Sequence, residues 1–305
     1  DIPVGTLTAV TGVSGSGKTT LVLESLVPAL RAQLAGEALP GHVRDVDAAG
    51  MSRVNLIDAT PIGVNVRSTV ATYSGVLDEL RRAFARTEEA TAAGLKAGAF
   101  SYNTGSLRCA TCDGTGQITL DVQFLPDVDI ECTQCRGSRY GTQANEIRRE
   151  GLSLPEIMTM SVDEARVAVR GLKKAGALLE TLSSLGLGYL TLGEATPALS
   201  GGEAQRLKLA SEMGRRQDGT LFVFDEPTIG LHPDDVQVLL DVLQRLIDRG
   251  ATVLVIEHDV DLIRCADWVI DMGPGGRIEG GRIVAQGTPT DIAANEASVT
   301  GRYLR

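Results

Sequence analysis

The stretch LTAVTGVSGSGKTT, residues 7–20, decides the fold of this 305-residue chain. An apolar run reaches a glycine-rich loop, and leucines at helical spacing then continue to about residue 34. A strand–loop–helix order of this kind binds phosphate, because backbone N–H groups gather at the start of the helix. A glycine loop with a purely structural role would not need both the lysine and the hydroxyl that follow. The candidate nucleotide ligands are Gly12, Ser14, Gly15, Gly17, Lys18, Thr19 and Thr20.

Two side chains of the loop have distinct expected roles. Lys18 is placed to reach the β- and γ-phosphates of ATP, and the Thr19 hydroxyl is placed to ligate Mg²⁺. ATP and Mg²⁺ are therefore the expected ligands of this segment.

Further strands indicate an α/β fold around this loop. The runs VNLID at 54–58, LFVFDEP at 221–227 and ATVLVIEHD at 251–259 read as strands, and residues 235–249 read as a helix. The two later runs are almost wholly apolar, which is typical of strands buried on both faces of a parallel sheet. We expect an ATP-binding domain in two discontinuous segments, 1–72 and 215–305.

Polar residues follow two of these strands. In parallel α/β sheets, ligand-binding and catalytic residues lie at the carboxyl ends of the strands. Asp225 is the candidate magnesium-associated carboxylate, and Glu226 is the candidate general base that polarises the attacking water. His258 ends the next strand and is a candidate γ-phosphate sensor. The alternative for the two carboxylates is that they only solvate a strand end, and a single histidine is more often structural.

Residues 73–214 do not continue the alternation of strands and helices, and they are expected to form an inserted, mainly helical domain. It opens with a helical stretch over 76–90 that has Leu77, Leu80 and Phe84 on one face, and it continues with polar helices such as 162–185. The run LSGGEAQR at 199–206 lies near its end. Its serine and glycines offer a hydroxyl and free N–H groups at a helix start, a second anion-binding terminus, although they also fit ordinary helix initiation.

Four cysteines in two C-x-x-C pairs have the spacing of a tetrahedral zinc site. They are Cys109, Cys112, Cys132 and Cys135, in a module at about residues 100–145. Gly114 and Gly137 permit a tight turn after each pair. Between the pairs, apolar and polar residues alternate from Ile118 to Phe124, which predicts a half-buried strand of a hairpin that turns at 125–127. Four thiolates leave no open position, so Zn²⁺ is expected to be structural; four free buried thiols are the alternative.

The bulk composition narrows the class of protein. The formal charge is −10, which argues against a nonspecific grip on nucleic acid by the whole surface. Five cysteines do not suggest a disulfide scaffold, and Cys265 in an apolar-rich stretch is expected to be buried. We find no 18-residue apolar run and no leader, so a soluble, cytoplasmic protein is expected, and the absence of an initial methionine suggests a fragment.

The order of phosphate loop, LSGGEAQR, FVFDEPTIGLH and IEHD resembles an ABC-type ATPase. The stretches TPIGVNVRSTVATYSGV, FSYNTGSLRCATCDGTG, FLPDVDIECTQCRGSRY, LGLGYLTLG and WVIDMGPGG extend the resemblance over essentially the whole chain. Together with the cysteine module they resemble the C-terminal ATPase half of the UvrA family, the damage-sensing ATPases of bacterial nucleotide excision repair.

The resemblance implies partners and further site residues. Signature residues serve the ATP site of a facing ATPase half, so a second half and a homodimer are implied, as are damaged duplex DNA, a UvrB-like repair protein and no membrane. The implied signature residues are Ser200, Gly201, Gly202 and Gln205. The arginines beside the cysteines, Arg108, Arg136 and Arg139, are candidates for DNA phosphates. A solvated charged face is the alternative for them.

One position departs from the family pattern. The family usually has a glutamine after the aspartate at 58, where this chain has Ala59. That glutamine helps to place magnesium and the attacking water, so weak or differently coupled hydrolysis is expected, and a divergent paralogue linked to drug resistance is an alternative. Two other functions remain open: a soluble ABC ATPase that remodels a non-DNA partner, and a regulatory module that binds nucleotide and hydrolyses little.

Overall fold

The computed structural model describes residues 1–63, 65–120, 128–213, 216–229, 231 and 233–305. The chain forms two compact units, which we call the sheet unit (residues 1–60 and 215–305) and the inserted unit (residues 61–214). Each unit is described by itself.

The sheet unit is built on one six-stranded sheet with the strand order β10-β9-β1-β8-β7-β2. Five strands run parallel, and β10 pairs antiparallel with β9 at one edge. The strands are β1 (Leu7–Gly12), β2 (Arg53–Ile57), β7 (Thr220–Asp225), β8 (Thr252–Ile256), β9 (Trp268–Gly273) and β10 (Arg282–Gly287). The parallel α/β core predicted from the apolar runs is therefore confirmed.

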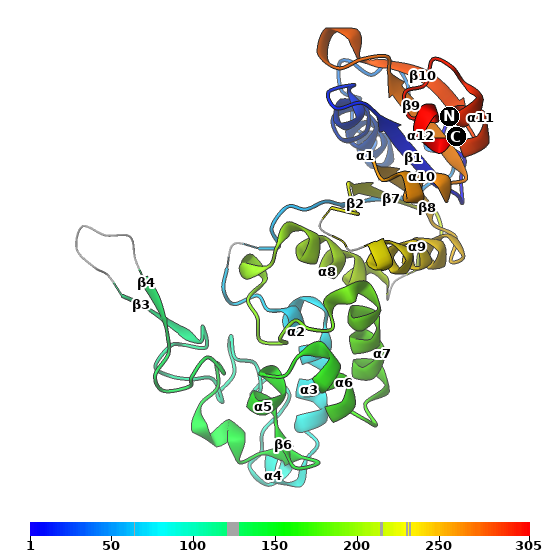
Figure 1. The fold of residues 1–305 in the computed structure, drawn as a ribbon. Coiled ribbons are helices and arrows are strands. Elements are labelled where there is room, and N and C mark those ends of the chain that lie inside the picture. The colour runs from blue at the N-terminus through cyan, green and yellow to red at the C-terminus, as the bar shows by residue number, and fades with distance from the viewer. Residues whose placement is uncertain (64, 121–127, 214–215, 230, 232) are drawn as a thin grey trace. The chain divides into compact units, whose positions relative to one another are not determined.

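Helices cover the sheet because alternate residues of each buried strand point to opposite faces. The helical segment that follows the loop, η1 (Thr20–Leu26) and α1 (Val27–Ala35), packs on the face that carries Val10, Leu254 and Ile270. Helix α9 (Pro233–Ile247) contacts β8 and β1, and α11 (Pro289–Ala294) contacts β9 and β10 (Figure 1). The remaining elements are α10 (Val260–Arg264), η5 (Arg277–Glu279) and α12 (Gly301–Leu304).

The inserted unit is mainly helical and carries two short hairpins (Figure 1). Its helices are α2 (Val70–Tyr73), α3 (Val76–Phe84), α4 (Glu88–Ala92), η2 (Thr142–Asn145), α5 (Leu154–Met158), α6 (Val162–Ala168), α7 (Lys173–Leu182), η3 (Ser183–Leu187), η4 (Thr196–Ala198) and α8 (Gly201–Met213). Its strands are β3 (Gln117–Leu120), β4 (Val128–Glu131), β5 (Arg148–Arg149) and β6 (Leu152–Ser153). Helix α3 packs against α7 and α5, and α7 packs against α8.

Aromatic side chains fill the core of this unit near the cysteine pairs. Tyr102 and Tyr140 meet edge to face with ring centroids 6.0 Å apart, and Phe84 and Phe100 lie 6.1 Å apart. All four side chains are almost completely buried. Such pairs stabilise beyond their buried area.

Two predicted helices are shorter than expected, although the predicted buried face of the first is confirmed. Helix α3 buries Leu77, Leu80 and Phe84, but it ends at Phe84, because Thr87 caps the separate helix α4 by accepting from Ala90 N. The helical run expected over 162–185 is divided between α6, α7 and η3. Gly171, with a φ of +90°, lies in the break before α7, a conformation that glycine adopts without strain.

The inserted unit begins at Pro61, which differs from the expected boundary at residue 72. The reason is that residues 61–72 are hydrogen-bonded within the inserted unit. Thr196 Oγ1 donates to Ile62 O at 2.7 Å, and Val70 N donates to Glu194 O at 3.0 Å.

One expectation about burial is wrong, and another is confirmed only at one residue. The antiparallel pair β3–β4 exists, and Ile118 is partly buried between the exposed Gln117 and Thr119, as the alternation predicts; on the returning strand β4, Val128 is 46% exposed and Ile130 is 37% exposed. Residues 121–127, which include the expected turn and part of the alternating run, lie outside the described residues. Cys265 is exposed rather than buried, because it follows the last turn of α10.

Candidate functional site

The phosphate loop of the sheet unit joins β1 to η1, and its glycines are required by its geometry. Gly12, Gly15 and Gly17 all have a positive φ, of +133°, +76° and +98°. A Cβ at Gly12 would lie 2.0 Å from Met272 O on the neighbouring strand. No larger residue fits there, so the loop conformation depends on glycine.

A second glycine-rich segment, residues 273–281, braces the loop and was not assigned a role from the sequence. Arg277 N donates to Gly15 O at 2.9 Å, and Gly281 N donates to Ser16 O at 2.8 Å. A Cβ at Gly276 would lie 2.5 Å from Ser14 O. Backbone contacts from residues 273–281 therefore hold the phosphate loop. The close approach at Gly276 leaves no room for a side chain.

Replacing Gly276 by alanine is expected to weaken ATP binding about tenfold, or about 1.4 kcal/mol, because the added methyl group displaces the phosphate loop. The backbone at Gly276 has a φ of −98°, so alanine is not strained by conformation itself. Titration with a fluorescent ATP analogue measures the affinity. The control is Gly41→Ala, since a Cβ at Gly41 meets no atom within 4 Å. Equal affinity in both variants would contradict the bracing role.

The loop side chains are arranged as a nucleotide site requires. Lys18 is buried, and its Nζ donates to Gly12 O at 3.0 Å and Val13 O at 3.1 Å. Thr19 caps η1 without a side-chain hydrogen bond, and Ser14 and Thr20 are exposed. Ser16 Oγ is buried without a partner among the described residues.

The carboxyl ends of β7 and β8 bring two predicted catalytic residues together. Glu226 follows β7 with a φ of +46°, and its N–H donates to Ile256 O at 2.9 Å. His258 Nε2 lies 3.2 Å from Glu226 Oε1. A histidine in contact with the candidate base can orient its carboxylate or relay a proton.

Glu257, between these strands' ends, was missed as a functional residue. It is 2% exposed and accepts four hydrogen bonds, from Thr228 N, Thr228 Oγ1, His258 N and Asp259 N, at 2.6–3.1 Å. This carboxylate fixes both loops that carry Glu226 and His258. The sequence signal was only a glutamate at a buried strand end.

The electrostatics of this edge favour a bound cation. Burial raises the pKa of Asp225, and the charges of Glu226, Asp58 and Glu257 raise it further, against the opposing effect of Lys18. Burial lowers the pKa of Lys18. The Lys18 ammonium thus interacts with several carboxylates, and oxygen ligands such as Asp225 and the Thr19 hydroxyl are of the type that Mg²⁺ prefers.

The predicted signature residues lie at the start of α8 in the inserted unit. Ser200 Oγ accepts from Glu203 N at 3.3 Å, and Glu203 Oε2 accepts from Ser200 N at 2.7 Å. Ser200 and Gly201 are exposed and Gly202 is partly exposed, as presentation to a phosphate requires. Gln205 is only 5% exposed, so it faces the interior of the unit, in contrast to its expected place in the ligand-facing set.

Tyr189 is a further residue at the signature that sequence reasoning missed. Its side chain is 63% exposed, and its hydroxyl donates to Glu203 Oε1. Burial of the phenol and this hydrogen bond raise the pKa of Tyr189 to about 12. The tyrosine remains neutral, and its hydroxyl holds the Glu203 carboxylate that also accepts from Ser200 N.

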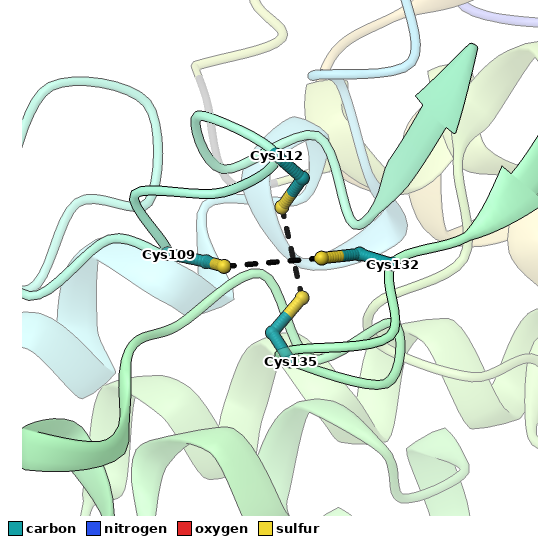
Figure 2. A group of neighbouring side chains, drawn as sticks. All are labelled: Cys109, Cys112, Cys132 and Cys135. Carbon is teal, nitrogen blue, oxygen red and sulfur yellow. Dashed lines mark hydrogen bonds between the residues drawn. The ribbon is translucent and has the colours of Figure 1, made fainter. Parts of the chain in front are cut away.

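The four cysteines of the predicted metal site converge on one point (Figure 2). Their sulfurs all lie within 4.8 Å of one another and all four residues are buried. Cys109 Sγ is 3.9 Å from Cys132 Sγ, and Cys112 Sγ is 3.6 Å from Cys135 Sγ. Tetrahedral zinc with Zn–S bonds of about 2.3 Å places its sulfurs about 3.8 Å apart. The cluster therefore fits Zn²⁺ in a closed structural site.

The knuckle backbones support this assignment. Gly114 and Gly137 turn the chain with φ of +80° and +74°. Burial raises the pKa of Cys112, but hydrogen bonds from Gly116 N and from the thiols of Cys135 and Cys109 outweigh it and lower the pKa, whereas burial raises the pKa of Cys135.

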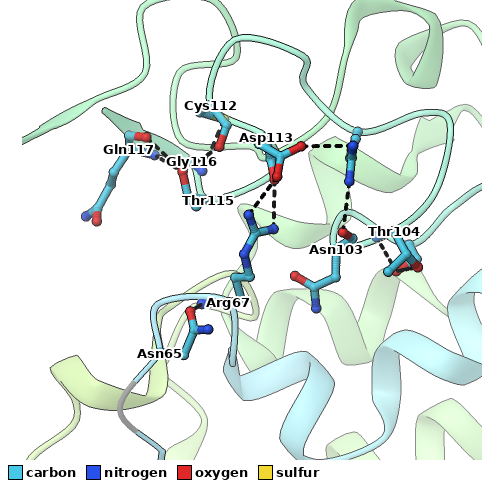
Figure 3. A network of polar contacts seen from close by, with 11 residues as sticks. Asn65, Arg67, Asn103, Thr104, Cys112, Asp113, Thr115, Gly116 and Gln117 are labelled. Carbon is cyan, nitrogen blue, oxygen red and sulfur yellow. Dashed lines mark hydrogen bonds and ion pairs between the residues drawn. The ribbon is translucent and has the colours of Figure 1, made fainter. Parts of the chain in front are cut away.

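The three arginines proposed for DNA have different surroundings. Arg136 is exposed. Arg108 is 39% exposed and pairs with Asp113 at 3.0 Å, and Asp113 also accepts from Arg67 (Figure 3). Arg139 is only 6% exposed and donates to backbone carbonyls. A buried guanidinium cannot meet a DNA phosphate, so the expectation for Arg139 is corrected.

Among the described residues, no helix is long and apolar enough to cross a bilayer. No family model matches the sequence. The chain is 49% identical over 306 residues to the UvrABC system protein A of Bacillus subtilis, and 47% identical to that of Synechocystis. Each match covers 99% of this chain and 32% of the relative, so the chain spans about a third of the length of these relatives.

A solved structure has the same fold. The crystal structure of UvrA2 from Deinococcus radiodurans matches with a TM-score of 0.91 and 44% identity, over 100% of this chain and 37% of that one. The match includes the discontinuous sheet unit and the cysteine-bearing insertion, since it extends over the whole chain. Over its whole length, the chain is therefore similar in sequence and fold to about a third of these UvrA proteins.

Proposed function

We propose that this chain is the C-terminal ATPase half of a UvrA-like protein that recognises DNA damage in nucleotide excision repair. The observation that supports this most is the four-cysteine cluster, which lies in the same inserted unit as the exposed signature serine. The whole-chain similarity to UvrABC system protein A supports it independently.

ATP hydrolysis in this proposal is divided among the residues of the sheet unit. Lys18 binds the phosphates by exchanging its contacts with Gly12 O and Val13 O for phosphate oxygens. Glu226 polarises the attacking water, and His258, 3.2 Å away, orients the Glu226 carboxylate or senses the γ-phosphate. Mg²⁺, held by Thr19 and Asp225, supplies charge neutralisation on the phosphates when it is bound.

The signature residues serve a different ATP molecule. Gly201 and Gly202 are the first residues of a 13-residue helix and Ser200 precedes them, and the N-terminus of a helix suits an anion. We propose that they face the ATP site of a second ATPase half, and that the working protein is a homodimer that hands damaged DNA to a UvrB-like partner.

DNA contact is assigned to the exposed cations of the zinc module. Arg136 is the strongest candidate because it is exposed, and Arg108 is second because its pairing with Asp113 competes with phosphate. Zinc is assigned a structural role: it fixes the two knuckles that present these side chains. Arg136 would position DNA without reading its sequence.

One comparison tests this proposal. The full-length protein is titrated with matched damaged and undamaged duplexes, with and without ATP, at several salt concentrations. Tighter binding of the damaged duplex that depends on ATP is expected, and Arg136→Ala is expected to weaken binding and reduce the salt slope by about one unit. Equal binding of both duplexes under all conditions would reject damage recognition. Absence of DNA binding would favour a remodelling ATPase with a non-DNA partner, which the net charge of −10 also allows.

Restoring the family glutamine in Ala59→Gln is expected to raise kcat for ATP hydrolysis roughly fivefold, about 1 kcal/mol of barrier. Ala59 is exposed, and its methyl group offers no ligand for magnesium or water. The neighbouring Asp58 accepts a hydrogen bond at Oδ1 from Thr60 Oγ1 at 2.6 Å. Steady-state turnover measures the change. Ala59→Ser, which is too short to reach the nucleotide, is the control, and an unchanged kcat in the glutamine variant would show that hydrolysis here does not depend on this position.

A further inference from the structure

Arg139 is a buried cation with an exceptional set of contacts. Its side chain is 6% exposed, its Nη1 donates to Val66 O at 2.8 Å, and its Nη2 donates to Gly193 O at 3.4 Å. The guanidinium lies over the ring of Tyr102 at 5.2 Å from the centroid, a cation–π contact. A buried charge is costly unless it is hydrogen-bonded, and these two hydrogen bonds and the ring contact hold the guanidinium, although Nε has no partner among the described residues.

The backbone of Arg139 belongs to the zinc module. It lies four residues after Cys135, and its carbonyl accepts from Cys109 N at 2.9 Å. Its Cγ also lies close to Gly116, where a Cβ would be 3.2 Å away. Arg139 therefore lies in contact with the backbone of both knuckles.

The two carbonyls that Arg139 holds lie in two segments with links to ATP. Val66 lies seven residues after Ala59, in the segment 62–69. Gly193 lies in the turn that leads to the signature serine. Thr196 joins the same two segments, because its N–H donates to Ser68 O at 2.9 Å and its Oγ1 donates to Ile62 O at 2.7 Å.

A second set of polar contacts between the zinc module and segment 62–69 lies at the surface (Figure 3). Arg67 donates to Asp113 O at 2.7 Å and to Asp113 Oδ2 at 2.9 Å. These two side chains are 29% and 56% exposed, and exposed ion pairs contribute little. The buried part of the connection consists of the contacts of Arg139 and of the Tyr102 hydroxyl, which donates to Arg67 O at 3.0 Å and lies 3.0 Å from Thr69 Oγ1.

We propose that Arg139 is a positioning residue that couples the zinc module to the signature: DNA bound at the knuckles shifts the guanidinium, and the guanidinium shifts the turn at Gly193 and the segment at Val66. This inference rests on the proposed function, because it needs both DNA binding and ATP hydrolysis. Arg139 touches neither ligand and acts through backbone carbonyls.

The test compares DNA-stimulated and basal ATPase rates in the full-length protein. Arg139→Met keeps the volume of the stem and removes every donor, and it is expected to lower the stimulation at least fivefold while DNA affinity and zinc content stay within twofold. Arg136→Met is expected to do the reverse: weaker DNA binding, but full stimulation at saturating DNA. The two residues share a positive φ, of +71° and +48°, so backbone strain is matched. Arg82→Met, at an exposed site of α3, is the inert control.

The outcomes separate the two proposals. Full stimulation in a zinc-loaded Arg139→Met protein would overturn the coupling role alone. A wild-type protein whose ATPase rate does not respond to DNA would overturn the proposed function and this inference with it. If Arg139→Met fails to fold or loses zinc, Arg139→Lys decides: one nitrogen cannot reproduce the fork, so reduced stimulation with intact zinc supports the role, and full stimulation rejects it.

Discussion

Replacing Glu226 by glutamine is expected to lower kcat for ATP hydrolysis by about 100-fold or more, with ATP affinity changed by less than about threefold. The amide keeps the shape of the side chain but cannot accept a proton from the attacking water. The carboxylate lies 3.2 Å from His258 Nε2 and 36% of its side chain is exposed, so a water molecule can reach it. Single-turnover hydrolysis and analogue binding separate the two quantities.

Two further variants make this result specific. Glu24→Gln, at an exposed position of η1 in the same unit, should leave kcat unchanged. His258→Gln is expected to have a smaller effect, about tenfold, because histidine acts through the glutamate. A Glu226→Gln protein that turns over ATP within threefold of the wild-type rate would show that another group activates the water.

The local parts of the ATP site could be predicted from the sequence because they depend on short-range geometry. The phosphate loop needs only a strand, three glycines and a helix in succession, and β1, the loop and η1 follow that order. The ends of β7 and β8 also follow from their apolar runs. The 3.2 Å contact between Glu226 and His258 required the strand order, which places β7 beside β8.

Contacts between distant segments could not be predicted. Asp271 on β9 accepts from Ser298 Oγ at 2.6 Å and Thr300 Oγ1 at 2.9 Å, and nothing in a single sequence pairs these residues. Gly276 looked like an ordinary loop glycine until its closeness to Ser14 O was known.

Burial was the least predictable property in the inserted unit. Arg139 was expected at the surface because arginine usually is, but Tyr102, Val66 and Gly193 together enclose it. Ile130 on β4 alternates with polar residues and is nevertheless 37% exposed, whereas Ile118 on β3 is partly buried against the cysteine cluster. Periodicity identifies a strand, whereas burial depends on what covers it.

Replacing Cys132 by alanine is expected to abolish stoichiometric zinc binding and to unfold the knuckles. Three thiolates leave the tetrahedral site open, and structural zinc contributes about 10–16 kcal/mol to the folding of small zinc domains. Apart from the cysteines themselves, only Ile118 packs against this buried cluster among the described hydrophobic residues, so the cluster has little apolar packing to replace the metal. Zinc content measured by a chromogenic chelator and limited proteolysis near residues 100–140 report the two effects.

The same substitution separates a structural zinc from a zinc that the ATPase needs directly. Because the sheet unit has its own core, Cys132→Ala should still bind an ATP analogue with affinity within about threefold of the wild type. Cys265→Ala is the matched control, since Cys265 is exposed and outside the cluster, and it should keep one zinc per chain. A Cys132→Ala protein that retains one zinc would reject the four-thiolate site. If the Cys132→Ala protein lost ATP binding together with zinc, folding of the sheet unit would depend on the metal. The two units would then not fold independently.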